Sequence, residues 1–333
     1  MTISYHWLSE YLPQTISPEN LSTILTSIGL EVESLEKYEN FKGGLAGLVV
    51  GEVLETVQHP NADKLKITKV HIGTDTPLNI VCGASNVAVG QKVVVATIGT
   101  TIYPKNGAPL TMKLAKIRGE ASEGMICAED EIGIGESHDG ILILSTDLPN
   151  GTPAAQYFQL TSDQVIEIGL TPNRADAASH WGVARDIHAV SGLPITLPNV
   201  DAIASGANTY PIEVNIKDDG CTRFCGLTID GVTVQDSPEW LKERLTAIGL
   251  RPINNIVDIT NYICHGLGQP MHAYDWQEIK GSKLFVKTLE KGTKFKTLDE
   301  VERTLSGEEL MICDSVGALG IAGVMGGADS GIK

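Results

Sequence analysis

The stretch from Arg251 to Trp276, RPINNIVDITNYICHGLGQPMHAYDW, concentrates side chains that can bind a polar ligand in an otherwise apolar segment. It contains three asparagines, two titratable histidines and three turn-forming residues, namely Asn254, Asn255, Asn261, His265, His272, Gly266, Gly268 and Pro270. Each residue alone also fits a loop that crosses a buried sheet, with its polar groups satisfied in the core. Their density favours the other interpretation, in which the stretch forms one wall of a binding pocket.

Charge is distributed unevenly along the chain. The formal net charge is −16, which disfavours a protein that coats nucleic acid through its overall field. Residues 42–119 nevertheless hold nine basic and four acidic residues, whereas residues 120–147 hold eight acidic residues and no lysine or arginine. A basic segment followed by an acidic one favours a structured anionic partner over indiscriminate binding.

Length and composition indicate an ordinary globular protein. At 333 residues the chain can form two or three domains. The start, MTISYHWLSEYL, is unlike a signal peptide, and no apolar run is long enough to cross a bilayer, so we expect a cytoplasmic protein. The six cysteines are scattered, and the pair Cys221 and Cys225 has no second pair to complete a metal site. We expect reduced thiols.

Residues 45–144 consist of short β-branched runs separated by glycine, proline and asparagine. Five or more short strands in this length predict a small barrel or sandwich. A barrel of the OB type would present one strand face and its flanking loops to an oligonucleotide, and the lysines fall where such a face can form. A solvated strand face explains the same lysines equally well, so both interpretations stay open.

Two helices are predicted by nearly the same sequence. SPENLSTILTSIGL (17–30) and SPEWLKERLTAIGL (237–250) align without a gap. In the first, Ser17 can cap the helix, Pro18 suits its first turn and Gly29 can end it. We favour convergence on the same helix signals over an ancient duplication.

A strand at residues 165–170 and a helix after it complement the first forty residues. The helix would bury Ala177, Trp181, Ala184 and Ile187. We therefore predict an α+β multidomain fold, in which the barrel is inserted in a small split α/β domain and a mixed α/β domain follows. The predicted bounds are 1–40 with 152–199, 41–151 and 210–333, with a linker at 199–209.

Five motifs occur in an order that resembles the β subunit of bacterial phenylalanine–tRNA ligase: HPNADKL (59–65), RGEASEGM (118–125), TPNRADA (171–177), the 251–276 stretch and AGVMGG (322–327). They span nearly the whole chain, and the ordered set is more specific than any single motif. A full β subunit is much longer, so the resemblance is to its N-terminal portion. It implies that 41–151 is an OB-fold tRNA-binding domain and that 210–333 is an editing domain of the B3/B4 type, truncated at its C-terminal end.

The resemblance implies that this last domain hydrolyses tyrosine attached to the phenylalanine tRNA. A hydrophobic pocket cannot strongly reject a near-isostere with one added hydroxyl, so a second, hydrolytic site is the physical remedy. The implied catalytic residues are His272 and Asn261, and the implied substrate-binding residues are Pro270, Ala322 and Gly323. An aminoacyl ester needs a positioned water and donors to the oxyanion. His272 can orient that water, Asn261 can bind polar groups of the substrate, and backbone N–H groups near Gly323 can face the oxyanion.

The resemblance assigns tRNA binding to the barrel. The candidate side chains there are all basic: Lys64, Lys66, Lys69, Lys113, Lys116 and Arg118. HPNADKL is predicted to be a turn that leads into the strand with Lys66 and Lys69. One departure from the family is Ala128, which follows GMIC at a position where the family usually has serine.

ATP-dependent attachment of phenylalanine to its tRNA is implied for the α2β2 assembly with the α subunit. In the family the α subunit carries the ATP and phenylalanine site, and the Mg²⁺-binding acidic cluster of the β subunit lies downstream of Lys333. We therefore expect that this chain binds neither cofactor. The tyrosine-sensing glutamate of the family lies beyond AGVMGG, after a segment that this chain does not contain, so we expect weak or no editing by this chain alone.

Two other classes of function stay open. A free-standing tRNA-binding module is favoured by the basic segment and disfavoured by everything after Tyr210, which such a module would not need. A scaffold that only holds the α subunit predicts that replacement of His272 or Asn261 leaves editing by the whole enzyme intact.

Overall fold

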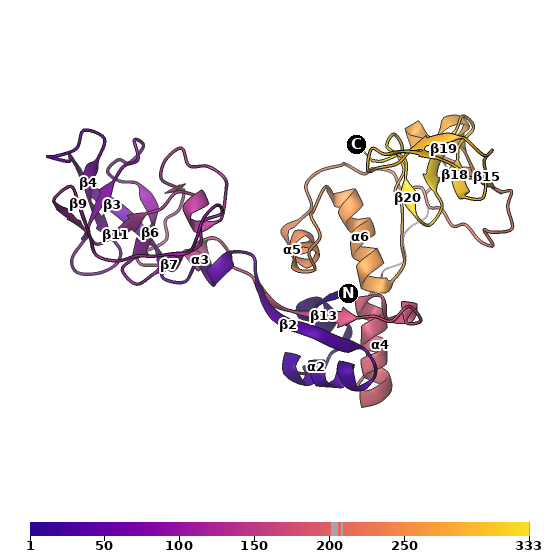
Figure 1. Ribbon diagram of the computed structural model, residues 1–333, viewed down its shortest axis with the longest axis horizontal. Coiled ribbons are helices and arrows are strands. Elements are labelled where there is room, and N and C mark those ends of the chain that lie inside the picture. The colour runs from indigo at the N-terminus through magenta and orange to yellow at the C-terminus, as the bar shows by residue number, and fades with distance from the viewer. Residues whose placement is uncertain (201–205, 208, 333) are drawn as a thin grey trace. The chain divides into compact units, whose positions relative to one another are not determined.

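A small three-stranded sheet organises the first part of the chain, and its strands come from both ends of an inserted segment (Figure 1). The strand order is β1 (Thr2–Ser4), β13 (Ser162–Gly169) and β2 (Glu31–Glu39). The chain leaves the sheet along β2 and returns along β13, so everything between them is inserted between two paired strands. The predicted insertion of a barrel into a split α/β domain is confirmed.

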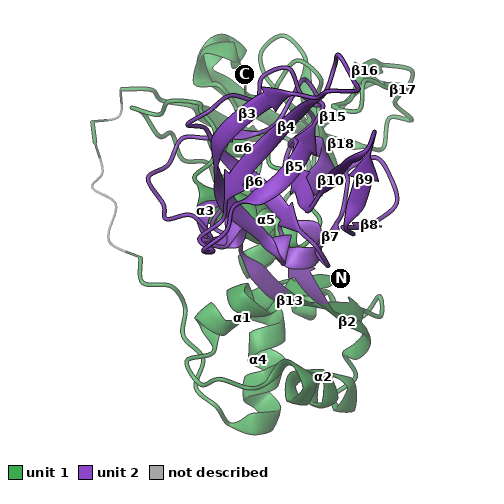
Figure 2. Ribbon diagram, turned by 90° about the vertical axis from the view of Figure 1, so that its left-hand side faces the viewer, with its two compact units in different colours: residues 1–36, 164–333 green, residues 37–163 purple. Residues whose placement is uncertain are grey.

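The structure is a computed structural model that describes residues 1–200, 206–207 and 209–332. The chain divides into two compact units, Met1–Glu36 with Gln164–Lys333 and Lys37–Asp163, which Figure 2 colours separately. Most of the predicted linker, residues 199–209, lies outside the described residues. The three predicted domains and their bounds stay a prediction.

Three helices pack on the small sheet and share one apolar core with it, to which Trp7, Leu25, Ile166 and Ile187 contribute. They are α1 (Tyr5–Tyr11), α2 (Pro18–Ser27) and α4 (His180–Ser191), the last preceded by the short turn η3 (Ala175–Ala177). The predicted start of α2 is confirmed, because the Ser17 hydroxyl accepts the N–H of Asn20 at 3.3 Å. Its predicted end is confirmed as well, since Gly29 follows with φ +86°.

The inserted unit is a nearly closed, strongly bent sheet. Its strand order is β11-β6-β3-β4-β5, with β12 also on β6. The bounds are β3 (Leu48–Gln58), β4 (Lys66–His71), β5 (Leu78–Cys82), β6 (Lys92–Thr97), β11 (Gly124–Ile126) and β12 (Ile143–Leu144). The N–H of Glu123 donates to the carbonyl of Asn79 at 2.8 Å, which joins the β11 end to β5. The predicted barrel is therefore confirmed.

Short elements decorate this barrel. Two small hairpins are formed by β7 (Thr101–Ile102) with β8 (Leu110–Thr111) and by β9 (Ala115–Ile117) with β10 (Glu120–Ser122). The helical pieces are η1 (Lys42–Leu45), η2 (Asp130–Ile132) and α3 (Ala154–Tyr157). The β9–β10 hairpin carries much of the predicted basic surface.

The last part of the chain has a five-stranded sheet of order β14-β15-β18-β19-β20. The strands are β14 (Glu213–Ile216), β15 (Lys283–Thr288), β18 (Leu310–Cys313), β19 (Ala318–Ile321) and β20 (Met325–Gly326), with a separate hairpin of β16 (Lys294–Lys296) and β17 (Glu302–Thr304). The helices are α5 (Glu239–Ala247) and α6 (Asn255–Leu267), followed by the turns η4 (Trp276–Glu278) and η5 (Lys280–Ser282). The second of the two similar sequences thus also forms its predicted helix.

Half of the 251–276 stretch is the helix α6, so the expectation of a tight turn at Gly266 is wrong. The Asn254 side chain accepts the N–H groups of Ile256 and Val257 at 3.1 and 3.0 Å and starts the helix. Gly268 ends it with φ +77°. Gly266 lies inside the helix, and a Cβ at this position would come within 3.1 Å of both Trp7 and Tyr11. The glycine allows close packing rather than a turn.

His180 connects α4 to two other elements. Its Nε2 accepts the N–H of Ser4 at 3.0 Å, and its Nδ1 donates to the carbonyl of His265 in α6 at 2.8 Å. The side chain is fully buried. The Trp7 ring stacks on His180 at 4.1 Å and on Tyr262 of α6 at 4.7 Å. These contacts fix α6, and the segment that follows it, to the small sheet.

Among the residues that the structure describes, no helix is both long and apolar enough to cross a bilayer.

Candidate functional sites

The HPNADKL loop is held against the tip of the β9–β10 hairpin by His59. This side chain is 3% exposed. Its Nδ1 accepts the N–H of Asn61 at 3.0 Å, so the ring proton is on Nε2, which donates to the carbonyl of Ile117 at 3.1 Å. Asn61 adds a second link, from its Nδ2 to the carbonyl of Arg118 at 3.2 Å. Two segments far apart in the sequence thus form one surface.

The hairpin tip itself has an unusual backbone. Ile117 pairs with Glu120, so Arg118 and Gly119 are the two residues of the turn, and both have positive φ, +51° and +106°. This is the turn type that matches strand twist, and it favours asparagine or glycine at both positions. An arginine with left-handed backbone costs about 1–2 kcal/mol. Strain of this kind persists where surrounding contacts hold the backbone. Here the hydrogen bonds accepted by the carbonyls of Ile117 and Arg118 hold it.

The six predicted tRNA-binding residues fall into two groups. Lys66 donates to the carbonyl of Val87 at 3.0 Å, and Lys69 pairs with Glu55 at 2.9 Å. The other four are exposed and form no ion pair or side-chain hydrogen bond with any residue that the structure describes; these are Lys64, Lys113, Lys116 and Arg118. Their charge is therefore available to an external anion. Their role in binding tRNA stays a prediction.

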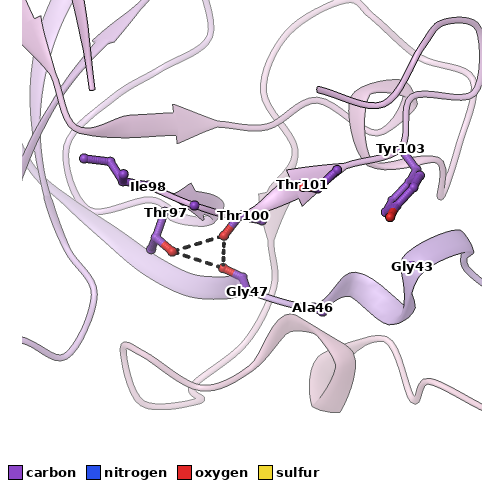
Figure 3. A pocket seen from close by; sticks show the side chains of 9 residues that line it. Gly43, Ala46, Gly47, Thr97, Ile98, Thr100, Thr101 and Tyr103 are labelled. Carbon is purple, nitrogen blue, oxygen red and sulfur yellow. Dashed lines mark hydrogen bonds between the residues drawn. The ribbon is translucent and has the colours of Figure 1, made fainter. Parts of the chain in front are cut away.

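Two of the pockets in the described part of the barrel unit lie near residues named above. One, of about 470 Å³, lies between η1 and residues 97–103 (Figure 3). Thr97 and Thr100 direct their hydroxyls at the Gly47 carbonyl, at 3.4 and 3.0 Å, which leaves those donors engaged. The other, of about 540 Å³, is bordered by Ala128 and Glu131. There the Glu131 carboxylate accepts the Ala128 N–H at 2.7 Å. Sequence patterns had indicated neither cavity.

His272 lies against the AGVMGG segment. A Cβ built on Gly326 would lie 2.5 Å from Cε1 of His272, so the imidazole occupies the space above this glycine. The ring of Tyr274 also lies beside it, with the two ring centroids 4.6 Å apart. The residue is exposed overall, but its partly covered ring is desolvated, which lowers the pKa of His272 below its ordinary value. The imidazole is therefore neutral at pH 7 and able to accept a proton.

A free backbone donor lies in the same segment. Residues 321–324 form the turn between β19 and β20, in which the N–H of Ala322 donates to Leu310 and that of Val324 to Ile321. Gly323, with φ +70°, donates its N–H to no residue in the described part of the chain. Such a group is the donor that an oxyanion requires.

Two other predicted residues are less closely tied to this segment. Asn261 is half-buried on α6, and its side chain forms no hydrogen bond to any described residue. Pro270 is exposed in the segment between Gly268 and His272. The structure thus brings His272 to AGVMGG but shows no hydrogen bond from Asn261 to either.

No three of the described histidine, cysteine, aspartate and glutamate side chains come together in a group that could hold a metal ion.

Two known families match the two regions that carry these sites. The family described as "Putative tRNA binding domain" matches residues 48–153, and the family described as "B3/4 domain" matches residues 220–333. The β subunit of phenylalanine–tRNA ligase from Bacteroides fragilis is 53% identical over 99% of this chain and 41% of its own length. The same subunit from Porphyromonas gingivalis is 54% identical over 100% of this chain and 41% of its own.

The chain belongs to the family of phenylalanine–tRNA ligase β subunits. It corresponds to their N-terminal portion and spans 41% of the length of these relatives. Among solved structures, the C-terminal domain of Plasmodium vivax p43 is 24% identical over 31% of this chain and 56% of its own, with a TM-score of 0.23. That TM-score is too low to support an argument.

Three residues that support the tRNA-binding and editing regions could not be identified from the sequence. His59 was noted only as part of HPNADKL, and His180 and Gly326 were not singled out as supports. Each acts on a residue distant in the sequence, such as Ile117 for His59 and His265 for His180. A local motif carries no signal for such a partner.

Proposed function

We propose that this chain is the tRNA-binding and editing part of a phenylalanine–tRNA ligase β subunit, which works with an α subunit in an α2β2 assembly. The whole assembly attaches phenylalanine to its tRNA with ATP and Mg²⁺. The part described here binds that tRNA through the barrel and hydrolyses tyrosine attached to it in the B3/4 domain. The cytoplasmic location expected from the sequence belongs to the same proposal.

The observation that carries the editing proposal is the meeting of His272 with the AGVMGG segment. The neutral imidazole of His272 lies over Gly326 of β20. Gly323 is three residues earlier, in the turn before this strand, and its N–H donates to no described residue. One group can accept a proton and the other can donate a hydrogen bond. These are the two functions that hydrolysis of an activated ester requires.

The chemistry follows from those two groups. His272 orients a water molecule and accepts one of its protons as the oxygen attacks the carbonyl carbon of the tyrosyl ester. The N–H of Gly323 donates to the oxyanion that forms. The bond from the carbonyl carbon to the ribose oxygen then breaks, and the proton passes from His272 to that oxygen. The products are free tyrosine and uncharged tRNA. Asn261, Pro270 and Ala322 are assigned to substrate binding.

ATP and Mg²⁺ belong to the proposed activity of the whole assembly, which membership of the β-subunit family supports. The free-standing module is disfavoured, since the similarity to β subunits covers 99% of this chain rather than the barrel alone.

The decisive experiment measures hydrolysis of tyrosyl-tRNA by the full-length β subunit assembled with its α partner. We expect His272→Ala to slow hydrolysis about 100-fold, because it removes a general base. Asn261→Ala should slow it about tenfold if its amide binds the substrate. Aminoacylation with phenylalanine should be preserved in both variants.

A matched control is His188→Ala, which removes an exposed histidine from α4 and should leave hydrolysis unchanged. If His272→Ala hydrolyses tyrosyl-tRNA as fast as this control, the 251–276 stretch is structural. The scaffold alternative would then be preferred for this part of the chain, and the family assignment would stand.

A further inference from the structure

Four exposed basic side chains of the barrel form no ion pair with any residue that the structure describes, and they lie on two separate segments. Lys64 belongs to the HPNADKL loop, whereas Lys113, Lys116 and Arg118 belong to the β9–β10 hairpin and the residues before it. An extended phosphate backbone contacts charges that are held at fixed spacing more effectively than charges on independently moving segments, because less ordering entropy is lost on binding. What joins the two segments is therefore relevant to affinity.

His59 makes that connection from a buried position. One ring nitrogen accepts from Asn61 within its own loop, and the other donates to Ile117 in the hairpin. The base of this short hairpin is attached to β5, where the Ser122 hydroxyl accepts the N–H of Val81 at 3.1 Å, whereas its turn at the other end has the strained backbone of Arg118. The His59 and Asn61 bonds take up the carbonyls of Ile117 and Arg118, two consecutive residues of this turn.

We propose that His59 is a positioning residue that clamps the HPNADKL loop to the β9–β10 turn, so that Lys64 and Arg118 present one fixed basic pair to the phosphate backbone of tRNA. This inference rests on the proposed tRNA-binding function of the barrel and deepens it. His59 itself contacts no phosphate, because its side chain is 3% exposed and both ring nitrogens are engaged.

Two substitutions separate the bond between the segments from the bond within the loop. In His59→Gln the side-chain amide reaches the position of Nε2 and can still donate to Ile117. In His59→Asn the side-chain oxygen replaces Nδ1 and can still accept from Asn61, but nothing reaches Ile117. A clamp between segments predicts that the glutamine variant works and the asparagine variant fails. A role confined to the fold of the loop predicts the reverse.

The experiment is filter binding of the full chain to phenylalanine tRNA across a range of salt concentrations. We expect His59→Asn to weaken binding about tenfold and to lower the log–log salt slope by about 1, the equivalent of one lost phosphate contact. His59→Gln should bind within about threefold of wild type. In the His59→Asn background, Arg118→Ala should weaken binding by less than it does in the wild-type chain, because the pair is already separated.

Lys105→Ala is the charge control, since this lysine is in the same unit and is paired with Glu136. It should change affinity by less than about twofold. Hydrogen exchange of residues 92–97, in the largely buried strand β6, verifies that each variant keeps the barrel. Wild-type binding by His59→Asn, or equal losses in both His59 variants, would overturn the clamp. Absence of tRNA binding by the wild-type chain would instead refute the proposed function, and the clamp with it.

Discussion

His59 and His180 lie in different units and use the same arrangement to different ends. Each is a buried imidazole that accepts a backbone N–H at one nitrogen and donates to a backbone carbonyl at the other. The tautomers are opposite, because the proton is on Nε2 of His59 and on Nδ1 of His180. His59 joins a loop to a hairpin tip beneath a basic surface, whereas His180 joins β1 and α6 inside an apolar core.

The difference lies in what surrounds each ring. His180 is fully buried and stacks on Trp7 at 4.1 Å, so its loss would leave a cavity and remove a hydrogen-bond partner from two backbone groups. His59 lies near the surface beside exposed residues such as Lys64 and Arg118. Loss of His59 exposes its partners to water, which can replace the hydrogen bonds. We infer that His180 contributes mainly to folding stability and His59 mainly to the geometry of a binding surface.

The largest expected effect is that of His180→Ala on stability. The substitution removes the acceptor of the Ser4 N–H, the donor to the His265 carbonyl and the ring that stacks on Trp7. Each change costs about 1–3 kcal/mol, so we expect the free energy of unfolding to fall by about 3–5 kcal/mol. Urea unfolding of the full chain measures this.

Hydrogen exchange localises the effect. Exchange in His180→Ala should increase in residues 1–12 and 255–268 and stay unchanged in β6 of the barrel. His188→Ala, on the exposed side of the same helix, is the matched control. If both variants lose the same small amount of stability, the contrast between the two histidines is wrong.

Acid should weaken the His180 connection in a defined pH window. Burial lowers the pKa of His180 to about 3, whereas the unfolded chain has an ordinary histidine pKa of about 6.5. Between these values the unfolded state binds a proton that the folded state does not. This group therefore stabilises the fold fully above about pH 6.5, and the contribution decreases by about 1.4 kcal/mol per pH unit as the pH falls toward 3.

The measurement is the difference in unfolding free energy between wild type and His180→Ala as a function of pH. That difference should shrink from pH 7 to pH 5, because the alanine variant has no group to titrate at this position. A constant difference over this range would show that His180 does not stay neutral in the folded chain.

The two similar helices show how far a local pattern predicts this structure. Both α2 and α5 were predicted, and Gly29 and Gly249 end them with φ +86° and +84°. The serines before them differ, however: Ser17 accepts the N–H of Asn20, whereas the Ser237 hydroxyl donates to the buried Asp258 of α6. Local signals specify the helix, but the partner of a side chain depends on the tertiary fold.

The same limit applies to the sites. Strand patterns predicted the barrel, and the resemblance supplied His272 and its neighbours as candidates. Neither pattern showed that Lys66 and Lys69 have internal partners, that Gly326 lies beneath the His272 ring, or that Gly266 is helical. These facts depend on contacts between segments that are distant in the sequence, which periodicity and motif spacing do not encode.

The smallest expected effect is that of Asn61→Ala. It tests how much each of the two hydrogen bonds, from His59 and from Asn61, contributes to holding the HPNADKL loop on the β9–β10 turn. This substitution removes the bond to the Arg118 carbonyl, but the backbone N–H of Asn61 still donates to His59. An exposed neutral hydrogen bond contributes about 0.5–1 kcal/mol, so we expect tRNA affinity to fall by about two- to fivefold, less than in His59→Asn. Because Asn61 contributes the exposed link and His59 the buried one, a larger loss in Asn61→Ala would mean that the turn is held mainly at Arg118. The residue to compare with His180 in the core would then be Asn61 rather than His59.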